Sequence, residues 1–396
     1  MSKIKISILI LSIFILSSCG YNPYEKPEDI TIDLNENIFE IYDKHTSKEL
    51  VKNINTEIIS KEVILKNDEL GTYTYTLEYL YKKKKYKYDI TYEIKDTTPP
   101  IFIGASKNIT IVKNSEDTPC SKIAYGDNYD NLPSCEVIGS YDLTKIGTYN
   151  NLKFIITDNS NNIAEKEFNL AVVSKINNST NYTKPKYLYI NDIKKYKNEF
   201  TSIGIDVSKW QGKVDFNKVK NAGIEFVIMR MGSWRDQNED ITMDPKFEEY
   251  YKLAKEVGLK IGVYIYNVSK SEEDGIKTAK WVIDNLHGEK IDFPIAYDWE
   301  DWSNFTSYHI SMHTLSNSYL AFEKTLKDAG YDAMLYSSKY YLENVWMHLE
   351  NSKVWLAHYT DKTDYQGNYM MWQMTSLAKI DGITENTVDI DILYLK

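Results

Sequence analysis

The segment Phe293-Pro294-Ile295-Ala296-Tyr297-Asp298-Trp299-Glu300 decides the fold of the C-terminal half of this 396-residue chain. Its first five residues are apolar and predict a buried strand that ends in two acids. Seven further strand-like runs occur after residue 200, and helical patterns follow the first four strands. This alternation predicts an α/β (TIM-like) barrel with reduced helices in its second half. The expected strands are 202–207, 226–231, 260–266, 293–299, 333–337, 354–358, 369–374 and 388–393, and the expected helices are 215–222, 244–257, 270–286 and 309–329.

Acidic residues lie at the ends of several of these strands, where barrel enzymes carry their chemistry. Asp206 ends the first strand, whereas Asp298 and Glu300 end the fourth. Asp389 and Asp391 lie in the last strand and face the same way, as Asp298 and Glu300 do, because residues two apart on a strand share a face. Repulsion and partial desolvation raise the pKa of one acid in such a pair, and glycoside cleavage uses one protonated and one ionised carboxyl group. A solvated acidic pair without a catalytic role is the simpler alternative.

A wider set of motifs occurs along residues 201–396, in a fixed order. The motifs are Gly204-Ile205-Asp206-Val207-Ser208 with Trp210-Gln211-Gly212, Phe226-Val227-Ile228-Met229-Arg230, Gly262-Val263-Tyr264-Ile265-Tyr266, Pro294-Ile295-Ala296-Tyr297-Asp298-Trp299-Glu300, Trp355-Leu356-Ala357-His358-Tyr359, Trp372-Gln373 and Val388-Asp389. Each motif alone is unspecific, but together they resemble a glycoside hydrolase family 25 lysozyme, whose fold is a barrel with reduced helices in its second half. Tyr336-Ser337-Ser338 departs from the usual Tyr-Thr-Asn of that family, and His358 stands where Gln is common.

The resemblance implies a reaction and roles for four acids. The reaction is hydrolysis of the β-1,4 bond between N-acetylmuramic acid and N-acetylglucosamine in peptidoglycan. Glu300 is implied as the general acid that protonates the leaving oxygen. The 2-acetamido oxygen of the substrate attacks the anomeric carbon with retention, and Asp298 orients that group in place of a protein nucleophile. Asp206 and Asp389 match the other active-site acids, which position groups and tune charge. No metal or cofactor is implied.

Aromatic residues of the same half are candidates for sugar binding, because sugar rings pack against aromatic faces. All 8 tryptophans of the chain lie after residue 200. A single aromatic residue is more often part of a core than of a binding site, so the prediction depends on clustering around the acids. The residues expected to line a substrate groove are Tyr264, Tyr266, Tyr336, Tyr359, Trp372 and Gln373.

The first 18 residues have the pattern of a secretory signal peptide, with Lys3 and Lys5 before an apolar run. The run ends in Leu16-Ser17-Ser18-Cys19-Gly20, which resembles the bacterial lipoprotein cleavage box. The resemblance implies a diacylglycerol on Cys19, a short leader over 19–28 and a position on the extracytoplasmic face of the bacterial membrane. Two acyl chains are enough for stable anchoring. An ordinary signal peptide with an incidental cysteine is the alternative.

Two strand-rich segments, 29–97 and 98–174, lie between the leader and the barrel. Gly71-Thr72-Tyr73 in the first segment recurs as Gly147-Thr148-Tyr149 in the second. We therefore expect two all-β immunoglobulin-like sandwiches in tandem, the second of which resembles bacterial Ig-like surface modules. The polar stretch 175–200 is expected to be a linker.

Cysteine usage fits an exported protein. With Cys19 lipidated, Cys120 and Cys135 are left, and a disulfide between them closes a loop of ~15 residues worth about 3 kcal/mol. Two free thiols are the alternative.

The formal net charge of −10 argues against nucleic acid as a partner, and loss of Lys3 and Lys5 with the signal peptide takes it to −12. The leading hypothesis is a membrane-tethered muramidase that acts on peptidoglycan, with the two β segments as a stalk. A non-catalytic wall-binding lipoprotein on a hydrolase-like barrel is the second hypothesis. A chitinase-like hydrolase is the third, although it would have a longer acidic run before Asp298.

Overall fold

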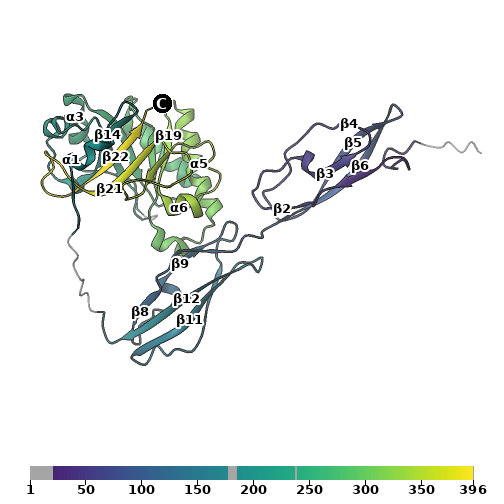
Figure 1. Ribbon diagram of the computed structural model, residues 1–396, viewed down its shortest axis with the longest axis horizontal. Coiled ribbons are helices and arrows are strands. Elements are labelled where there is room, and N and C mark those ends of the chain that lie inside the picture. The colour runs from purple at the N-terminus through teal and green to yellow at the C-terminus, as the bar shows by residue number, and fades with distance from the viewer. Residues whose placement is uncertain (1–20, 177–184, 237–238, 396) are drawn as a thin grey trace, which may run out of the picture. The chain divides into compact units, whose positions relative to one another are not determined.

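The computed structural model describes residues 21–176, 185–236 and 239–395, and it divides after Thr97 into two compact units (Figure 1). Unit 1 ends at Thr97, and unit 2 begins at Thr98. Unit 2 contains the second strand-rich segment together with the barrel. The expected signal peptide and Cys19 lie outside the described residues.

Unit 1 is built around a long antiparallel hairpin of two strands, β5 and β6, which pair from Gly71 opposite Ile94 to Tyr81 opposite Lys84. β2 runs parallel to β6, and β4 pairs with β5, while β1 and β3 form a second, two-stranded sheet. Alternate residues such as Ile90 are buried, as the period of two in the sequence predicts. The elements are β1 Ile32–Leu34, β2 Ile38–Glu40, η1 Ser47–Leu50, β3 Val51–Ile54, β4 Glu57–Ile58, β5 Gly71–Tyr81 and β6 Lys84–Lys95.

Residues 98–174, called the β segment of unit 2 below, repeat the strand arrangement of unit 1. A long hairpin of β11 and β12 has β8 parallel to β12 on one side and β10 antiparallel to β11 on the other. β7 and β9 form a second, two-stranded sheet. Gly71 and Gly147, which begin the repeated Gly-Thr-Tyr motif, are the first residues of β5 and β11. The elements are β7 Ile101–Gly104, β8 Asn108–Val112, η2 Cys120–Lys122, β9 Ala124–Gly126, β10 Ser134–Ile138, β11 Gly147–Thr157 and β12 Ile163–Val173.

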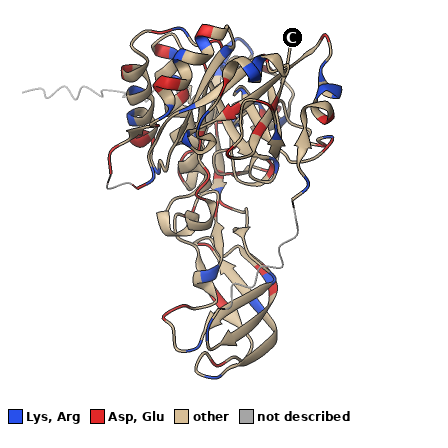
Figure 2. Ribbon diagram, turned by 90° about the vertical axis from the view of Figure 1, so that its left-hand side faces the viewer, with Lys and Arg blue, Asp and Glu red and all other residues tan. Residues whose placement is uncertain are grey.

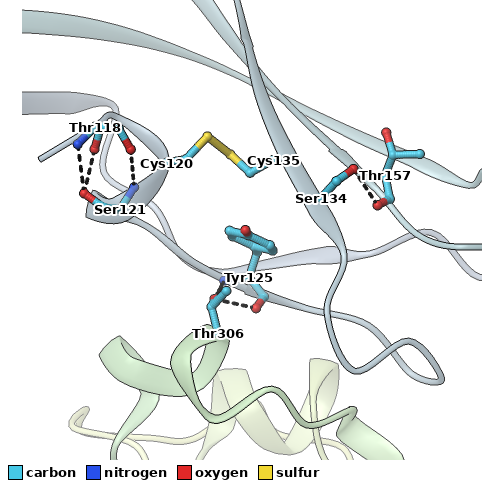
Figure 3. Close-up of a disulfide and its surroundings, with 8 residues drawn as sticks. All are labelled: Thr118, Cys120, Ser121, Tyr125, Ser134, Cys135, Thr157 and Thr306. Atoms are coloured by element: carbon cyan, nitrogen blue, oxygen red, sulfur yellow. Dashed lines mark hydrogen bonds between the residues drawn. A yellow bond between two sulfur atoms is a disulfide. The ribbon is translucent and has the colours of Figure 1, made fainter.

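The two segments thus share a strand plan, and their immunoglobulin-like identity stays a prediction. In the structure, Cys120 and Cys135 are joined by a disulfide (Figure 3). This bond ties the short helix η2 to strand β10 on the periphery of a core in which Phe154 and Phe168 stack at a centroid distance of 3.8 Å.

The barrel is a closed ring of eight strands. Its order is β14-β15-β17-β18-β19-β20-β21-β22, and β22 pairs again with β14. The eight strands are β14 Thr201–Val207, β15 Phe226–Ser233, β17 Lys260–Tyr266, β18 Ile295–Asp298, β19 Ala333–Ser338, β20 Val354–Ala357, β21 Met371–Lys379 and β22 Val388–Tyr394. Each falls on one of the eight predicted runs, and the barrel-like fold of the C-terminal part is confirmed.

Helices cover the first part of the ring more fully than the last part. They are η4 Lys209–Gln211, α2 Phe216–Asn221, α3 Phe247–Val257, α4 Glu272–Leu286, η5 Trp302–Tyr308, α5 Met312–Asp328 and α6 Lys339–Asn344, and Figure 1 shows α3 and α5 outside the strands. A short strand, β16 Thr242–Met243, pairs with β15. Within residues 354–395, all of which are described, no helix follows β20 or β21. The prediction of reduced helices in the second half agrees with this arrangement.

The last strand, β22, runs opposite to the other seven. It pairs antiparallel with both β14 and β21, whereas the other neighbours in the ring are parallel. In this register Asp206 lies opposite Asp389. The N-terminal end of β22 therefore lies beside the C-terminal ends of the other strands, which places the acids of both kinds of strand at one end of the barrel.

Inward-facing side chains fill the ring below these acids. Phe226 and Ile228 of β15 are fully buried in a cluster with Met334 and Met371. Gly204 of β14 is required here, because a Cβ at that position would overlap the ring of Phe226. The closed, filled interior supports the polar layer above it, as expected for a barrel of eight strands.

Part of the expected linker belongs to the barrel. β13 Leu188–Tyr189 pairs with β21, and it is followed by α1 Ile190–Ile193 and η3 Lys194–Tyr196. Ile193 is fully buried in the barrel core. The polar composition of 175–200 had predicted a linker throughout, but a few apolar residues are enough to pair and bury the part from Leu188 onward.

Candidate active site

A cavity of about 300 Å³ opens at the end of the barrel where the parallel strands finish. Its lining includes the four acids that the sequence predicted, Asp206, Asp298, Glu300 and Asp389. In Figure 2, acidic segments stand out among the largely uncharged strands of the barrel. The first three acids come from or directly after parallel strands, and Asp389 comes from the reversed strand β22.

Asp298 and Glu300 project into the same cavity from the end of β18. Trp299, which lies between the two acids in the sequence, is fully buried in the hydrophobic core. Its Nε1 donates a hydrogen bond to the Ser269 carbonyl over 2.9 Å. This anchor fixes the backbone between the two acids. Asp298 is only 5% exposed, whereas Glu300 is exposed to solvent.

Burial is the main cause that raises the pKa of both carboxyl groups. The charge of Glu300 raises the pKa of Asp298 further, whereas the charges of Arg230 and Arg235 lower it. Because two neighbouring carboxylates repel each other, the pair keeps one proton to a higher pH than two separate carboxyl groups would. The two guanidinium groups act on Asp298 and offset part of the increase in its pKa.

The two arginines differ in how they are held. Arg230 of β15 is buried, and its Nη2 and Nε lie 2.6 Å and 2.7 Å from the same oxygen of Asp244. Arg235 is exposed at the cavity, with its guanidinium carbon 5.2 Å from the ring centroid of Tyr266. The cavity thus combines four acids with one buried, ion-paired cation and one exposed cation.

Gln373 connects the acids to the aromatic wall of the cavity. Its Nε2 donates to Asp206 Oδ2 over 2.8 Å. Its Oε1 accepts hydrogen bonds from the hydroxyl groups of Tyr336 at 2.8 Å and Tyr359 at 3.0 Å. Because the oxygen is occupied by two donors, the amide can present only its NH₂ group to Asp206. The pKa of Asp206 is raised well above its ordinary value by burial, then by the charges of Asp389 and Asp391.

The structure separates the two acids of β22. Asp389 lines the cavity, and burial raises its pKa to about 7. Asp391 is fully buried and does not line the cavity, and its Oδ1 accepts a hydrogen bond from Trp355 Nε1 over 2.8 Å. Burial and the charge of Asp389 raise the pKa of Asp391 well above its usual range. Asp391 therefore lies behind the site and acts on it through Asp206 and Asp389.

The structure brings five of the six predicted sugar-binding residues to the cavity, namely Tyr264, Tyr266, Tyr336, Tyr359 and Gln373. Trp372 is the exception and corrects the sequence interpretation. It is 3% exposed, its Nε1 donates to the His358 carbonyl over 2.8 Å, and its ring lies edge-on to Tyr196. Adjacent residues on a strand face opposite sides, so an inward Gln373 requires an outward Trp372.

Sequence reasoning did not assign several residues that line the cavity. They are Ser208, Trp210, Gln211, Arg230, Arg235 and Trp355. Trp210 is 58% exposed, which is unusual for tryptophan and marks it as a surface for a ligand. Ser208, Trp210 and Gln211 stand in the opening motif, so position directly after the first strand was the signal that could have identified them.

A second cavity of about 550 Å³ lies beside the first and shares part of its lining. Glu300, Tyr336 and Tyr359 line both cavities. Tyr340 and His358 line only the second. Glu300 therefore lies on the boundary that the two cavities share.

Comparisons with known proteins concern this part of the chain. Residues 205–383 match the family model for Glycosyl hydrolases family 25. An autolytic lysozyme of Clostridium acetobutylicum is 28% identical over 191 residues, which are 48% of this chain and 54% of that protein. The uncharacterized protein YegX of Escherichia coli K12 is 24% identical over 196 residues, 49% of this chain and 70% of YegX. The crystal structure of a bacterial lysozyme from Streptomyces coelicolor is 22% identical, covers 49% of this chain and 92% of that one, and has a TM-score of 0.43.

The chain spans about half the length of the clostridial relative that it matches. The matched family range contains Asp206, Asp298 and Glu300 and ends shortly before Asp389. Residues 205–383 therefore carry the sequence pattern of the glycosyl hydrolases family 25.

Proposed function

We propose that this chain is a muramidase that hydrolyses the β-1,4 bond between N-acetylmuramic acid and N-acetylglucosamine in peptidoglycan. The observation that carries the proposal is the pair of acids, Asp298 and Glu300, in one cavity with their pKa values raised by burial. The family 25 domain and the likeness to a clostridial autolytic lysozyme support the choice of substrate.

Glu300 serves as the general acid in this proposal. A carboxylic acid can protonate a leaving oxygen only while it holds its proton, and the raised pKa of Glu300 keeps the proton on to a higher pH. Glu300 lines both cavities, so its carboxyl group lies within reach of the scissile oxygen of a glycan that occupies both.

Asp298 stabilises the charge that develops on the sugar. The arginines favour its ionised form, and its Oδ1 accepts no hydrogen bond from the described residues. The carboxylate of Asp298 lines the cavity, where it accepts a hydrogen bond from the N–H of the 2-acetamido group while the acetamido oxygen attacks the anomeric carbon. Substrate assistance of this kind needs no nucleophile from the protein and retains the anomeric configuration.

Asp206 and Asp389 complete the acidic side of the cavity, with Gln373 fixing the direction of Asp206. Aromatic residues of the same cavity supply faces for the sugar rings, and Trp210 and Tyr359 are each 58% exposed. The same cavity thus provides polar groups for orientation and apolar faces for binding, as carbohydrate sites require.

We place the enzyme on the outer face of the bacterial membrane, anchored through a lipid on Cys19. The sequence pattern before Cys19 supports this placement. Among the described residues, no helix is long and apolar enough to cross a membrane. We expect Cys19→Ala to remove the protein from the detergent-soluble membrane fraction, and unchanged retention there would refute lipidation.

The activity is tested by incubating the chain without its first 18 residues with purified peptidoglycan, followed by borohydride reduction and mass spectrometry of the products. Reduced N-acetylmuramic acid at the new ends is the expected result. Reduced N-acetylglucosamine ends would mean that the other glycosidic bond is cut. Binding without cleavage would favour a non-catalytic wall-binding lipoprotein, and cleavage of chitin alone would favour a chitinase-like enzyme.

The control is Glu300→Gln, which preserves size and hydrogen bonding but cannot donate a proton as an acid. We expect its turnover to fall by roughly 10² to 10⁴-fold while binding is retained. Near-full turnover of this variant would show that another residue is the acid.

A further inference from the structure

The β segment of unit 2 is packed against the part of the barrel that follows Glu300 directly. That part consists of Asp301 and η5, and the first turn of η5 is tied back to the acid because the Trp302 N–H donates to the Glu300 carbonyl over 2.8 Å. Trp302 also contacts Trp299 at a ring-centroid distance of 4.7 Å. η5 is therefore a second support of the Glu300 backbone, beside the Trp299 anchor.

Thr306 of η5 is hydrogen-bonded to strand β9 as though it were part of a neighbouring strand. Its Oγ1 accepts from the Tyr125 N–H at 2.8 Å and donates to the Tyr125 carbonyl at 2.7 Å (Figure 3). Two hydrogen bonds from one hydroxyl group to the same residue fix both the distance and the direction of Thr306 relative to Tyr125. Without Thr306, both backbone groups of Tyr125 at this half-buried contact would lose a partner.

The next residue of β9, Gly126, is fitted to Phe305. A Cβ at Gly126 would overlap the Phe305 ring and lie 3.0 Å from Ile103 Cδ1. Ile103 and Ala124 of the β segment are buried in the same hydrophobic core as the barrel strands. Apolar packing therefore continues without interruption from the β segment into the barrel.

The β segment also provides hydrogen-bond partners for the start of α5. The first N–H groups of a helix have no partners within it. The Met312 N–H donates to the Asp127 carbonyl at 2.8 Å, and the preceding Ser311 N–H donates to Asn131 Oδ1 at 2.8 Å. A barrel cut free at residue 201 would lose these partners together with the apolar contacts of Ile103.

We propose that the barrel-facing surface of the β segment, made of Ile103, Tyr125, Gly126, Asp127 and Asn131, is a positioning element of the active site that holds η5 and thereby Glu300. The inference rests on the proposed function for the identity of the acid. It assigns this segment a role in turnover beyond that of a spacer between the membrane and the barrel.

The test uses the whole chain without its first 18 residues and compares Thr306→Val with Thr306→Ser. Valine keeps the shape but removes both hydrogen bonds, whereas serine keeps the hydroxyl. We expect Thr306→Val to lower kcat on peptidoglycan by about tenfold with KM within about twofold, and Thr306→Ser to restore kcat. Thr325→Val is the matched control, since Thr325 Oγ1 donates only to the Ala321 carbonyl within α5.

Hydrogen exchange of the segment 299–313 provides a reading that does not need turnover. Gly126→Ala should speed exchange there, because its Cβ displaces Phe305, whereas Gly104→Ala should not, because its Cβ makes an ordinary contact at 3.8 Å with Ala124. A wild-type chain that does not cleave peptidoglycan would overturn the proposed function, and the exchange comparison would still decide whether the β segment holds η5. Unchanged exchange in Gly126→Ala overturns the inference, as does a Thr306→Val enzyme with kcat within twofold of wild type or with a change in KM alone.

Discussion

Gln373 donates a hydrogen bond to Asp206 over 2.8 Å while its own oxygen accepts two tyrosine hydroxyl groups. The amide is 2% exposed and joins an acid of β14 to the aromatic side of the cavity. Its orientation is set by the two tyrosines, and the orientation of Asp206 is set by the amide.

Replacing Gln373 with leucine should therefore damage the site more than the loss of one contact suggests. Asp206, Tyr336 and Tyr359 would each lose a partner inside the cavity, and an unpaired buried polar group costs about 1–3 kcal/mol. We expect the chain to remain folded with a lower melting temperature and kcat to fall by roughly 10–100-fold. Steady-state kinetics and thermal unfolding on the same samples measure both effects.

Gln366→Leu is the control for this change, because Gln366 is exposed and its amide donates only to the Asp364 carbonyl. Gln366→Leu should change neither kcat nor the melting temperature. Equal effects of the two substitutions would mean that the hydrogen bonds of Gln373 do not organise the site.

The buried acid Asp391 should make the stability of unit 2 depend on pH. Its folded-state pKa is raised by burial, so the folded chain binds a proton that the unfolded chain releases once the pH exceeds its ordinary pKa. The free energy of unfolding should then decrease as the pH rises from about 4, by at most about 1.4 kcal/mol per pH unit for one proton. Asp391→Asn keeps an oxygen for Trp355 but cannot ionise, and it should flatten this slope in urea titrations at several pH values.

Stability at pH 4 should be similar in the Asp391→Asn variant and the wild type, because both side chains are then neutral. A variant whose pH slope equals that of the wild type would show that Asp391 is not among the groups that titrate on unfolding.

The two tryptophans Trp210 and Trp372 should respond oppositely to truncation. Trp210 is 58% exposed at the cavity, so Trp210→Ala should raise KM with little change in melting temperature. Trp372 is 3% exposed in the core, so Trp372→Ala should lower the free energy of unfolding by about 3–5 kcal/mol. Chemical unfolding and kinetics of both variants make the comparison, and a destabilised Trp210→Ala would place that side chain in the core.

The disulfide between Cys120 and Cys135 should stabilise the β segment of unit 2. It spans 15 residues, and the chain-entropy argument assigns about 3 kcal/mol to a loop of this length. We expect the double variant Cys120→Ser/Cys135→Ser to unfold at a lower denaturant concentration than the oxidised wild type. The reduced wild type is the control and should unfold with the double variant; coincidence of all three curves would contradict the prediction.

Local pattern was sufficient to predict much of the barrel. Each of the eight strands forms on a run that is apolar enough to be buried, and Asp298 and Glu300 lie at one end because two residues on a strand share a face. The direction of β22 could not be read in this way, because alternation along a strand is the same for parallel and antiparallel neighbours. The outward position of Trp372 followed from alternation with Gln373 and could have been predicted.

The contact between the β segment and the barrel could not be predicted from the sequence. Ile103 and Ala124 lie in apolar, strand-like runs, and such residues are expected in the core of a sandwich. In the structure they are buried in the core of the barrel, a pairing between residues more than a hundred positions apart. Nothing in the local sequence shows whether these two residues are buried in the core of the β segment or in the core of the barrel.

The reversed strand β22 has a consequence for when the enzyme can act. It closes the ring between β14 and β21, and it is the last of the eight strands to leave the ribosome. Until β22 is in place, Asp389 is absent, Asp206 has no partner residue on the neighbouring strand β22, and the ring of strands is not closed. A chain that is still being synthesised therefore lacks the closed ring and one of the four acids, and the cavity is completed only when β22 has joined the barrel.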